Sequence, residues 1–337
     1  MDVNKKLTLL AALYIATYFA HAQPQKAATI GFYNLENLFD TVDDPAVDDA
    51  EYLPNGKNQW TDERYQQKLA NMAQVIAGMS PDVLGVCELE NRKVLEDLIR
   101  QPILAAKRYQ IVHFDMQDLR GVDVALLYRP AVFKPFAFIQ IPVRDPEEPD
   151  FKTRNILWVK GLINSHDTLH VAINHWPSRR GGGGKETKRL LAAEALRKTF
   201  DSVLTINPKA NIIALGDFND DPNNRSIKKI LTPPSAKNPA QLYNAAEPTF
   251  KKGYGTLAFN GMWNLFDQMI LSPALTDNTG TEYEPNSFTI FAPLQMRQST
   301  GKDKGAPKRT FRGDVYEPTG YSDHFPVFLI VRTGLMD

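Results

Sequence analysis

The segment from Asn211 to Asp221, NIIALGDFNDD, constrains the fold of this chain more than any other. Its residues Ile212 to Leu215 form a short apolar run that fits a buried β-strand. Gly216 ends the run, and three acids and an amide follow: Asp217, Asn219, Asp220 and Asp221. Such a strand delivers polar groups to the rim of a core, where sites of α/β folds are usually found. Taken alone, the segment also fits a strand that leaves the core through an Asp/Asn turn.

Most other predicted strands have polar side chains at one end. These are Asn34 and Glu36 after 28–33, Glu88 after 82–87, His175 after 169–173, Asp267 at the start of 266–271, and Asp323 with His324 before 327–331. Asn34 and Glu36 lie on one side of the first strand if that strand continues through them. A turn or cap explains each of these residues singly, but together they indicate a site.

Three helices and further strands complete the predicted fold. Thr61 or Asp62 caps a helix that ends at Met79, and its apolar stripe consists of Tyr65, Leu69, Met72, Ile76 and Met79. Two more helices are expected at 92–100 and 186–204, and four more strands at 109–114, 122–128, 136–141 and 155–162. Because no linker or repeat interrupts this series, we expect one domain over residues 23–337 with a core of two sheets.

The first 22 residues have the pattern of a signal peptide. Lys5 and Lys6 precede the apolar segment Leu7 to Ala20, which is short for a membrane span, and Ala20-His21-Ala22 fits a cleavage site. An uncleaved anchor helix is the alternative. We therefore expect an exported chain in the periplasm or outside the cell, without a membrane span after cleavage.

Charge and cysteine content exclude several classes of protein. With 39 basic and 39 acidic residues, the chain has no overall attraction to nucleic acid or anionic membranes, so any such attraction is local. Cys87 is the single cysteine, so the chain forms no internal disulfide. It lies in the apolar run DVLGVC, which predicts a buried small hydrophobe and argues against a cysteine protease.

The combined donor set predicts a hard divalent cation. Carboxylates, amides and two histidines gather at the strand ends, without a second cysteine. Oxygen ligands of this kind suit Mg²⁺, with Mn²⁺ or Ca²⁺ as alternatives. Zinc usually has more histidine or cysteine ligands than these strand ends offer.

Six motifs together resemble the endonuclease/exonuclease/phosphatase superfamily, which contains deoxyribonuclease I, exonuclease III-type nucleases, neutral sphingomyelinases and inositol polyphosphate 5-phosphatases. In the order of the family they are N-L-E-N at 34–37, C-E-L-E at 87–90, N-H-W-P-S at 174–178, G-D-F-N at 216–219, F-D-Q-M-I-L at 266–271 and S-D-H-F-P-V at 322–327. The resemblance implies an α+β fold, a four-layer α/β/β/α sandwich of two mainly antiparallel sheets flanked by helices. It also implies divalent-metal-dependent hydrolysis of phosphate esters, and we expect a secreted bacterial branch.

The resemblance also implies a metal site. Glu88 matches the main metal carboxylate of the family. Asn34, Glu36 and Asp323 match its companions, directly or through water, although the family usually has a shorter Asp in place of Glu36. The remaining strand-end residues match catalytic positions of the family.

Among those catalytic matches, Asp217 corresponds to the residue that orients or deprotonates the attacking water, and Asn219 to a hydrogen-bond donor to phosphate. His324 matches the histidine that contacts the scissile phosphate, and Asp267 orients it. His175 occupies a position that carries His or Tyr near the leaving group. The chain shows no evident counterpart of the carboxylate that pairs with this first histidine in deoxyribonuclease I.

Two segments bear on the substrate. Arg179, Arg180 and four glycines follow His175 in SRRGGGGK, and glycine-rich backbone and arginine both bind phosphate. Residues 298–313 form a basic loop near Asp323. Both segments also fit solvated loops, but together they favour a polyanionic substrate.

We therefore predict an exported phosphodiesterase that acts by in-line attack of water, and an endonuclease or exonuclease on nucleic acid. We expect a monomer without a stable protein partner. A phospholipid or sphingomyelin phosphodiesterase or a phosphatase is the alternative, and a non-catalytic binding protein on this fold is a second. The 5-phosphatase substrate motif is absent around Asp267. A sphingomyelinase needs an exposed aromatic hairpin, and its candidates here, Trp263 and Phe266, are assigned to the core.

Overall fold

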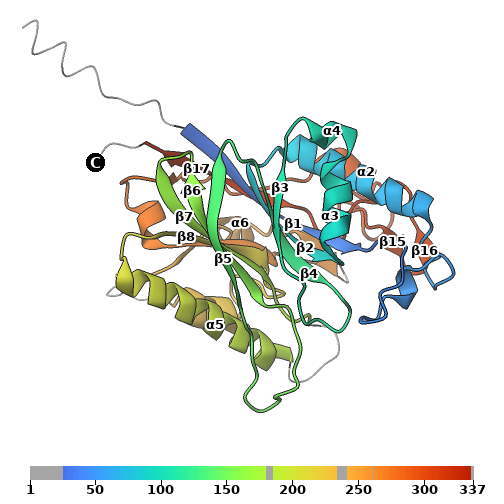
Figure 1. The fold of residues 1–337 in the computed structure, drawn as a ribbon, viewed down its shortest axis with the longest axis horizontal. Helices are drawn as coiled ribbons and strands as arrows, with labels where there is room; N and C mark the ends of the chain where they lie inside the picture. Colours follow the sequence, from blue (N-terminus) through green and yellow to red (C-terminus); the bar gives the residue numbers. More distant parts are fainter. Residues whose placement is uncertain (1–25, 180–184, 234–240, 260, 335–337) are drawn as a thin grey trace, which may run out of the picture.

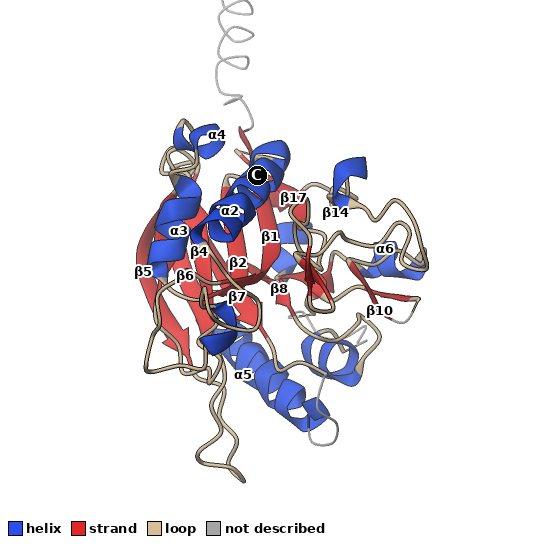
Figure 2. Cartoon of the chain, turned by 90° about the vertical axis from the view of Figure 1, so that its right-hand side faces the viewer, coloured by secondary structure: helices blue, strands red, loops and turns tan. Residues whose placement is uncertain are grey.

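Two β-sheets pack face to face at the centre of the molecule, and helices cover their outer faces (Figure 1, Figure 2). The computed structural model describes residues 26–179, 185–233, 241–259 and 261–334. This four-layer arrangement confirms the predicted fold class. The predicted signal peptide, residues 1–22, lies outside the described residues.

The first sheet is mixed and has the order β13-β17-β1-β2-β4-β3, with β14 also pairing with β17. Only β1 and β2 run parallel among its paired strands. Its strands are β1 (Lys26–Leu38), β2 (Val83–Leu89), β3 (Gln110–His113), β4 (Asp123–Tyr128), β13 (Glu282–Tyr283), β14 (Thr289–Ile290) and β17 (Val327–Thr333).

The second sheet has the order β5-β6-β7-β8-β12-β9, with β7 and β8 parallel. Its strands are β5 (Phe133–Ile141), β6 (Ile156–Ile163), β7 (Asp167–His175), β8 (Asn211–Asp217), β9 (Tyr243–Asn244) and β12 (Asp267–Leu271). Two small hairpins lie outside both sheets, formed by β10 (Leu257–Phe259) with β11 (Met262–Asn264) and by β15 (Phe311–Arg312) with β16 (Val315–Tyr316).

The long helices connect the parallel strands and cover the sheets. Helix α2 (Asp62–Met79) joins β1 to β2, and α5 (Lys185–Ile206) joins β7 to β8. The Thr61 side chain caps α2 by accepting a hydrogen bond from the Arg64 amide. The shorter helical elements are η1 (Ala50–Tyr52), α3 (Arg92–Ile99), α4 (Pro102–Ala105), η2 (Ser226–Leu231), α6 (Glu247–Lys251), η3 (Pro273–Thr276) and η4 (Leu294–Met296). Within the described ranges, no helix has the length and apolar character needed to cross a bilayer.

Strand alternation divides the core into three layers. On β8, Ile213 and Leu215 face the other sheet, whereas Ile212 and Ala214 pack against the α5 side. On β2, Cys87 faces the other sheet and is fully buried, as its apolar surroundings predict. Both faces of each central strand are therefore covered, which explains why these strands read as continuous apolar runs.

Gly85 of β2 lies in close contact with the other sheet. A Cβ atom at this position would lie 2.2 Å from the Leu215 Cδ1 of β8 and 3.3 Å from two carbons of Ile173 on β7. At such a distance the buried Leu215 side chain must shift within a closely packed core. Glycine at this position thus leaves room for the Leu215 and Ile173 side chains between the sheets.

We predict that Gly85→Ala lowers the free energy of unfolding by about 1–3 kcal/mol, because it overpacks the centre of the sandwich. Urea unfolding measures the change. Leu215→Val removes the clashing methyl group. It should therefore lower the free energy of unfolding by less in the Gly85→Ala background than in the native chain. Additive effects of the two substitutions would show that they do not meet.

His170 of β7 makes the stability of the second sheet dependent on pH. Its Nδ1 accepts a hydrogen bond of 3.1 Å from the Trp158 indole N–H of β6. Burial, with a smaller effect of Lys160, lowers the pKa of His170 to about 4. An indole is a donor only, so protonation of Nδ1 breaks this bond.

We expect the chain to lose stability as the pH falls from about 6.5 to about 4, because the unfolded chain then binds a proton that folded His170 does not. The effect is absent above this window. His170→Asn should flatten the curve of urea midpoint against pH there. Parallel curves for the native chain and the His170→Asn variant would contradict the assignment to His170.

Candidate active site

The predicted site residues converge at one edge of the two sheets. Asn34 lies on β1, His175 ends β7 and Asp217 ends β8, and the register places His175 beside Asp217. Because β12 runs antiparallel to β8, its first residue Asp267 pairs with Asp217. The Asn34 Nδ2 of the first sheet donates a 3.1 Å hydrogen bond to the Asp217 Oδ2 of the second. The strand ends of both sheets therefore form one site.

Three residues of the site have a left-handed backbone. Glu36, Glu88 and Asn219 have φ angles of 50°, 58° and 50°. Non-glycine residues rarely adopt this conformation, and it is enriched at functional sites. The pairing of β1 with β2 shifts register between Asn34 and Leu38, so the alternation expected for Asn34 and Glu36 does not continue. The bend instead brings the Glu36 backbone amide to the Asn34 Oδ1, at 2.8 Å.

His324 and Asp267 form a buried pair. The His324 Nδ1 lies 2.7 Å from the Asp267 Oδ2, and the Thr256 hydroxyl donates to the same oxygen. Burial lowers the pKa of His324, but the nearby Asp267 and Asp217 carboxylates hold it well above 6.5. The pair fixes the ring so that Nε2 lies 3.8 Å from the Asp217 Oδ2.

Asp217 lies at the centre of the site. Its Oδ1 accepts a 2.9 Å hydrogen bond from the Asn219 backbone amide, and its Oδ2 accepts from Asn34. Burial raises the pKa of Asp217 to about 7, with the Asp267 carboxylate acting in the same direction and His324 against it. The carboxyl group can therefore accept or release a proton near neutral pH.

Glu88 and His175 lie beside Asp217. The His175 Nε2 is 3.5 Å from the Glu88 Oε1 and 3.9 Å from the Asp217 Oδ2. The His175 Nδ1 is buried and makes no hydrogen bond within the described part of the chain. Burial, with Arg154 next in size, lowers the pKa of His175 well below 6.5, which keeps the ring neutral. No carboxylate pairs with Nδ1 among the described residues, so the missing partner stays unassigned.

Glu36 is held by a buried lysine and a loop amide. Its Oε2 accepts a 2.7 Å hydrogen bond from the Thr310 amide and lies 3.6 Å from the Lys68 Nζ. Burial and the nearby Asp323 raise the pKa of Glu36 to about 7, against Lys68. Lys68 also donates to the carbonyl oxygens of Glu36 and Tyr321 and to the Thr310 hydroxyl. Lys68 thereby links the end of β1 to the loops that contain Thr310 and Tyr321.

The remaining predicted residues lie on the β8 side. Asn219 Nδ2 donates a 2.9 Å hydrogen bond to the Trp176 carbonyl, which leaves its second N–H available. The Arg179 guanidinium packs over the Phe266 ring and contacts Asp220 and Asp221. Its binding of substrate stays a prediction. Arg180 lies outside the described residues.

Two buried cations and one hydroxyl were missed from the sequence. Lys68 lies three residues after Tyr65 and four before Met72, on the apolar stripe of α2, and that position was the available signal. Arg154 donates to the carbonyls of His175 and Trp176 and to Asp118, but no periodic pattern surrounds it. Thr256 precedes a short hairpin and likewise gives no signal.

The donor set fits a divalent cation. Ligand atoms of Glu88, His175 and Asp217 all lie within 4.8 Å of one another. Burial raises the pKa values of Glu36 and Asp217 to about 7, and repulsion from the nearby Asp323 and Asp267 carboxylates acts in the same direction. A hard cation among oxygen donors relieves that repulsion. Asp217, Asp267 and His324 form a second such group, but the His324–Asp267 hydrogen bond already occupies two of its atoms.

Comparison with known proteins identifies the class. The model of the Endonuclease/Exonuclease/phosphatase family matches residues 29–333, so the chain belongs to this family. The motifs had predicted this membership. No curated protein matches the chain by sequence.

Solved structures share the fold. D. rerio TDP2 complexed with single strand DNA product is 15% identical, with a TM-score of 0.57 over 91% of this chain and 100% of that one. An endonuclease/exonuclease/phosphatase family protein from Bacteroides thetaiotaomicron is 16% identical, with a TM-score of 0.56 over 92% and 99%. The human Nocturnin catalytic domain with bound sulfate is 16% identical, with a TM-score of 0.55 over 91% and 97%. At these identities the likeness shows the fold alone.

We predict that Lys68→Met lowers the free energy of unfolding by about 2–4 kcal/mol, because Glu36 and two carbonyl groups lose their buried partner. Hydrolytic activity should fall with it, since Glu36 is no longer held. Lys93→Met, in an exposed ion pair on α3, is the matched control and should change stability by less than about 0.5 kcal/mol. Equal effects of the two substitutions on urea unfolding would contradict this role of Lys68.

Proposed function

We propose that this protein is a divalent-metal-dependent phosphodiesterase that hydrolyses phosphate esters by in-line attack of water, and that its substrate is nucleic acid. The observation that carries the proposal is the convergence of Asp217 with the His324–Asp267 pair, 3.8 Å apart, beside Glu88 and His175. Membership of the family supports phosphoester hydrolysis in general.

In this proposal Glu88 holds the cation, with Asn34, Glu36 and Asp323 as companions. A bound Mg²⁺, Mn²⁺ or Ca²⁺ would offset negative charge on a non-bridging phosphate oxygen as the transition state forms. Glu88 and Glu36 both have a left-handed backbone, a conformation that is enriched at functional sites.

Asp217 acts on the attacking water. Hydrogen bonds from Asn34 and the Asn219 amide fix both of its carboxylate oxygens. A base must be held this rigidly to align water opposite the leaving oxygen. Its pKa of about 7 suits proton transfer at neutral pH.

His324 and Asn219 stabilise the phosphate. The pKa of His324 is held above its usual value, so the ring carries a positive charge while Asp267 accepts the Nδ1 proton in a hydrogen bond. Nε2–H and the free N–H of Asn219 then donate to phosphate oxygens, where charge develops. His175, neutral and near Glu88, is assigned to the leaving-group side.

Observations on two relatives support a phosphate ester as the substrate, and one of them supports nucleic acid as its class. One D. rerio TDP2 structure contains a single strand DNA product, and the Nocturnin structure contains sulfate, an analogue of phosphate in shape and charge. Export to the periplasm or medium, directed by residues 1–22, is part of the proposal, as is a monomeric state. An exported nuclease would meet nucleic acid outside the cytoplasm.

The exposed hairpin β10–β11 favours one alternative, a phospholipid or sphingomyelin phosphodiesterase. Phe259, Met262 and Trp263 have exposed fractions of 57%, 67% and 40%. The assignment of Trp263 to the core was wrong, because the short hairpin lies outside both sheets, whereas Phe266 is buried as predicted. Exposed aromatic side chains at a hairpin fit a membrane interface as well as a base.

We predict that Asp217→Asn and His324→Ala each lower the hydrolysis rate of bis-p-nitrophenyl phosphate by about 10²–10⁴-fold, the usual contribution of general acid–base groups. Urea unfolding of Asp217→Asn should stay near that of the native chain, since Asn keeps the shape and loses a buried charge. His324→Ala should unfold at a lower urea concentration, because Asp267 loses its buried partner, but it should still be folded in the absence of urea. Asp201→Asn, in a surface ion pair of α5, is the matched control and should keep full activity.

EDTA should abolish hydrolysis, and Mg²⁺ or Mn²⁺ should restore it and raise the unfolding temperature of the native chain, since a ligand of the folded state stabilises it. Activity that persists in EDTA would contradict the metal. Full activity in Asp217→Asn or His324→Ala would remove that residue from the mechanism.

A further inference from the structure

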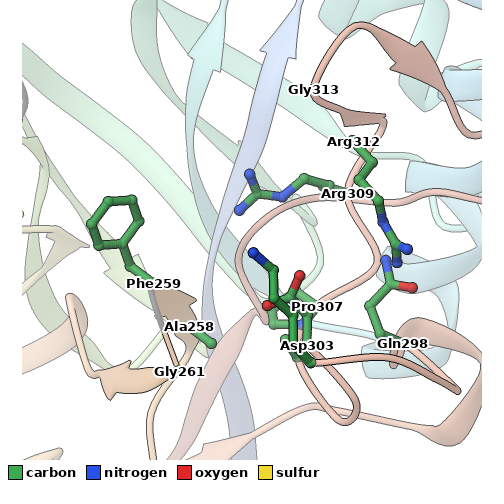
Figure 3. Close-up of a pocket in the computed structure, with 11 residues that line it drawn as sticks. Ala258, Phe259, Gly261, Gln298, Asp303, Pro307, Arg309, Arg312 and Gly313 are labelled. Atoms are coloured by element: carbon green, nitrogen blue, oxygen red, sulfur yellow. The ribbon is translucent and has the colours of Figure 1, made fainter.

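A cationic pocket lies beside the site, between the β10–β11 hairpin and the 298–313 segment. Its cavity measures about 330 Å³ and is lined by Ala258 and Phe259 on the hairpin side and by Lys302, Asp303, Arg309 and Arg312 on the other. Figure 3 shows Arg309 extending from the segment into the space that separates it from the hairpin. No role in the proposed chemistry has been given to these side chains.

The pocket is joined to the catalytic residues on both sides. The Arg309 guanidinium lies 3.8 Å from the Asp323 Oδ2, and the Asp323 Oδ1 lies 4.0 Å from the His324 Nε2. On the hairpin side, Thr256 donates to Asp267 and its carbonyl accepts from the Phe325 amide. A group bound in the pocket is therefore next to a group bound at His324.

The positive charge of the pocket is largely unpaired. Lys302, Arg309 and Arg312 line it against a single acid, Asp303. Within the described ranges, neither Lys302 nor Arg312 has a carboxylate within 4.0 Å, and Arg309 has only Asp323, at 3.8 Å. Arginines in this state bind phosphate through their fixed set of donors. The pocket is thus complementary to an anion.

We propose that this pocket is a subsite for a second phosphate group of the substrate, next to the scissile one. The proposal rests on the proposed function and narrows its substrate to a phosphodiester with at least two phosphates, such as an oligonucleotide. A sphingomyelin or phosphatidylcholine headgroup carries one phosphate and one quaternary ammonium group. The three cations of the pocket repel that ammonium group. The charge of the pocket therefore favours nucleic acid over the lipid alternative.

Trp263 offers a surface for the base attached to that phosphate. Its ring stacks on Phe325, the residue after His324, with centroids 6.3 Å apart and an interplanar angle of 17°. It pairs in register with Ala258, which lines the pocket, so both side chains lie on one face of the hairpin. Exposed aromatic rings beside a cationic groove bind single-stranded bases by stacking.

The test compares the double variant Lys302→Gln/Arg312→Gln with Lys304→Gln, an exposed lysine of the same segment that does not line the pocket. The ratio of kcat/KM for a single-stranded DNA octamer to that for bis-p-nitrophenyl phosphate should fall at least tenfold in the double variant, through KM. The slope of log(kcat/KM) for the octamer against log[salt] should become shallower by about 1.4 for the two lost contacts. Lys304→Gln should keep the native ratio and slope.

Binding of the fluorescein-labelled octamer in EDTA, followed by anisotropy, tests the subsite apart from catalysis. Loss of binding in the double variant alone supports the subsite. Equal binding by the native chain and both variants overturns the subsite. An equal loss of kcat/KM for the octamer and for bis-p-nitrophenyl phosphate in the double variant also overturns it.

Sphingomyelin vesicles complete the test. A double variant that loses hydrolysis of vesicles and retains that of the octamer would overturn the subsite in favour of a lipid surface. A native chain that hydrolyses no phosphodiester would remove the proposed function, and the anisotropy titration would still decide whether the pocket binds a polyphosphate strand.

Discussion

The hydrogen bond from Asn34 to Asp217 joins the two sheets at the edge where the chemistry is proposed, and the site depends on it. Asp217 ends β8, and Asn34 lies where the regular pairing of β1 with β2 is interrupted. Deeper in the sandwich, Gly85 lets Leu215 pack close to the β2 backbone. A wider separation would break the contact and move Glu88 away from Asp217. The apolar core therefore positions the polar site.

The site brings several buried carboxyl groups together, which is electrostatically unfavourable. Cations from other parts of the fold offset part of this repulsion. Burial raises the pKa values of Glu36 and Asp217, and the nearby Asp323 and Asp267 carboxylates act in the same direction. Lys68 and His324 supply positive charge on either side of the site, each held by further hydrogen bonds. Glu88 and the other carboxyl groups of the site suit a divalent cation. They also repel a polyanionic substrate, and a cationic pocket next to the site offsets that repulsion.

The architecture and the convergence of the strand-end residues could be predicted from the sequence, because both depend on local patterns. Apolar runs that end in acids indicated β2 and β8, and their polar ends meet as expected. The directions of those side chains could not be predicted, since they depend on the left-handed backbone at Glu36 and Glu88. Lys68 was missed because a lysine in an amphipathic helix usually faces solvent. Trp263 was misassigned because its hairpin packs on neither sheet.

The most direct test of the account is hydrolysis by the chain 23–337 of plasmid DNA, structured RNA, sphingomyelin and bis-p-nitrophenyl phosphate, in Mg²⁺, Mn²⁺ or EDTA. The account predicts metal-dependent cleavage of nucleic acid and of the small diester. Metal-dependent cleavage of sphingomyelin with nucleic acid untouched would contradict the substrate and keep the chemistry. Absence of turnover on all four, with Mg²⁺ bound by calorimetry, would contradict the central claim and identify a binding protein.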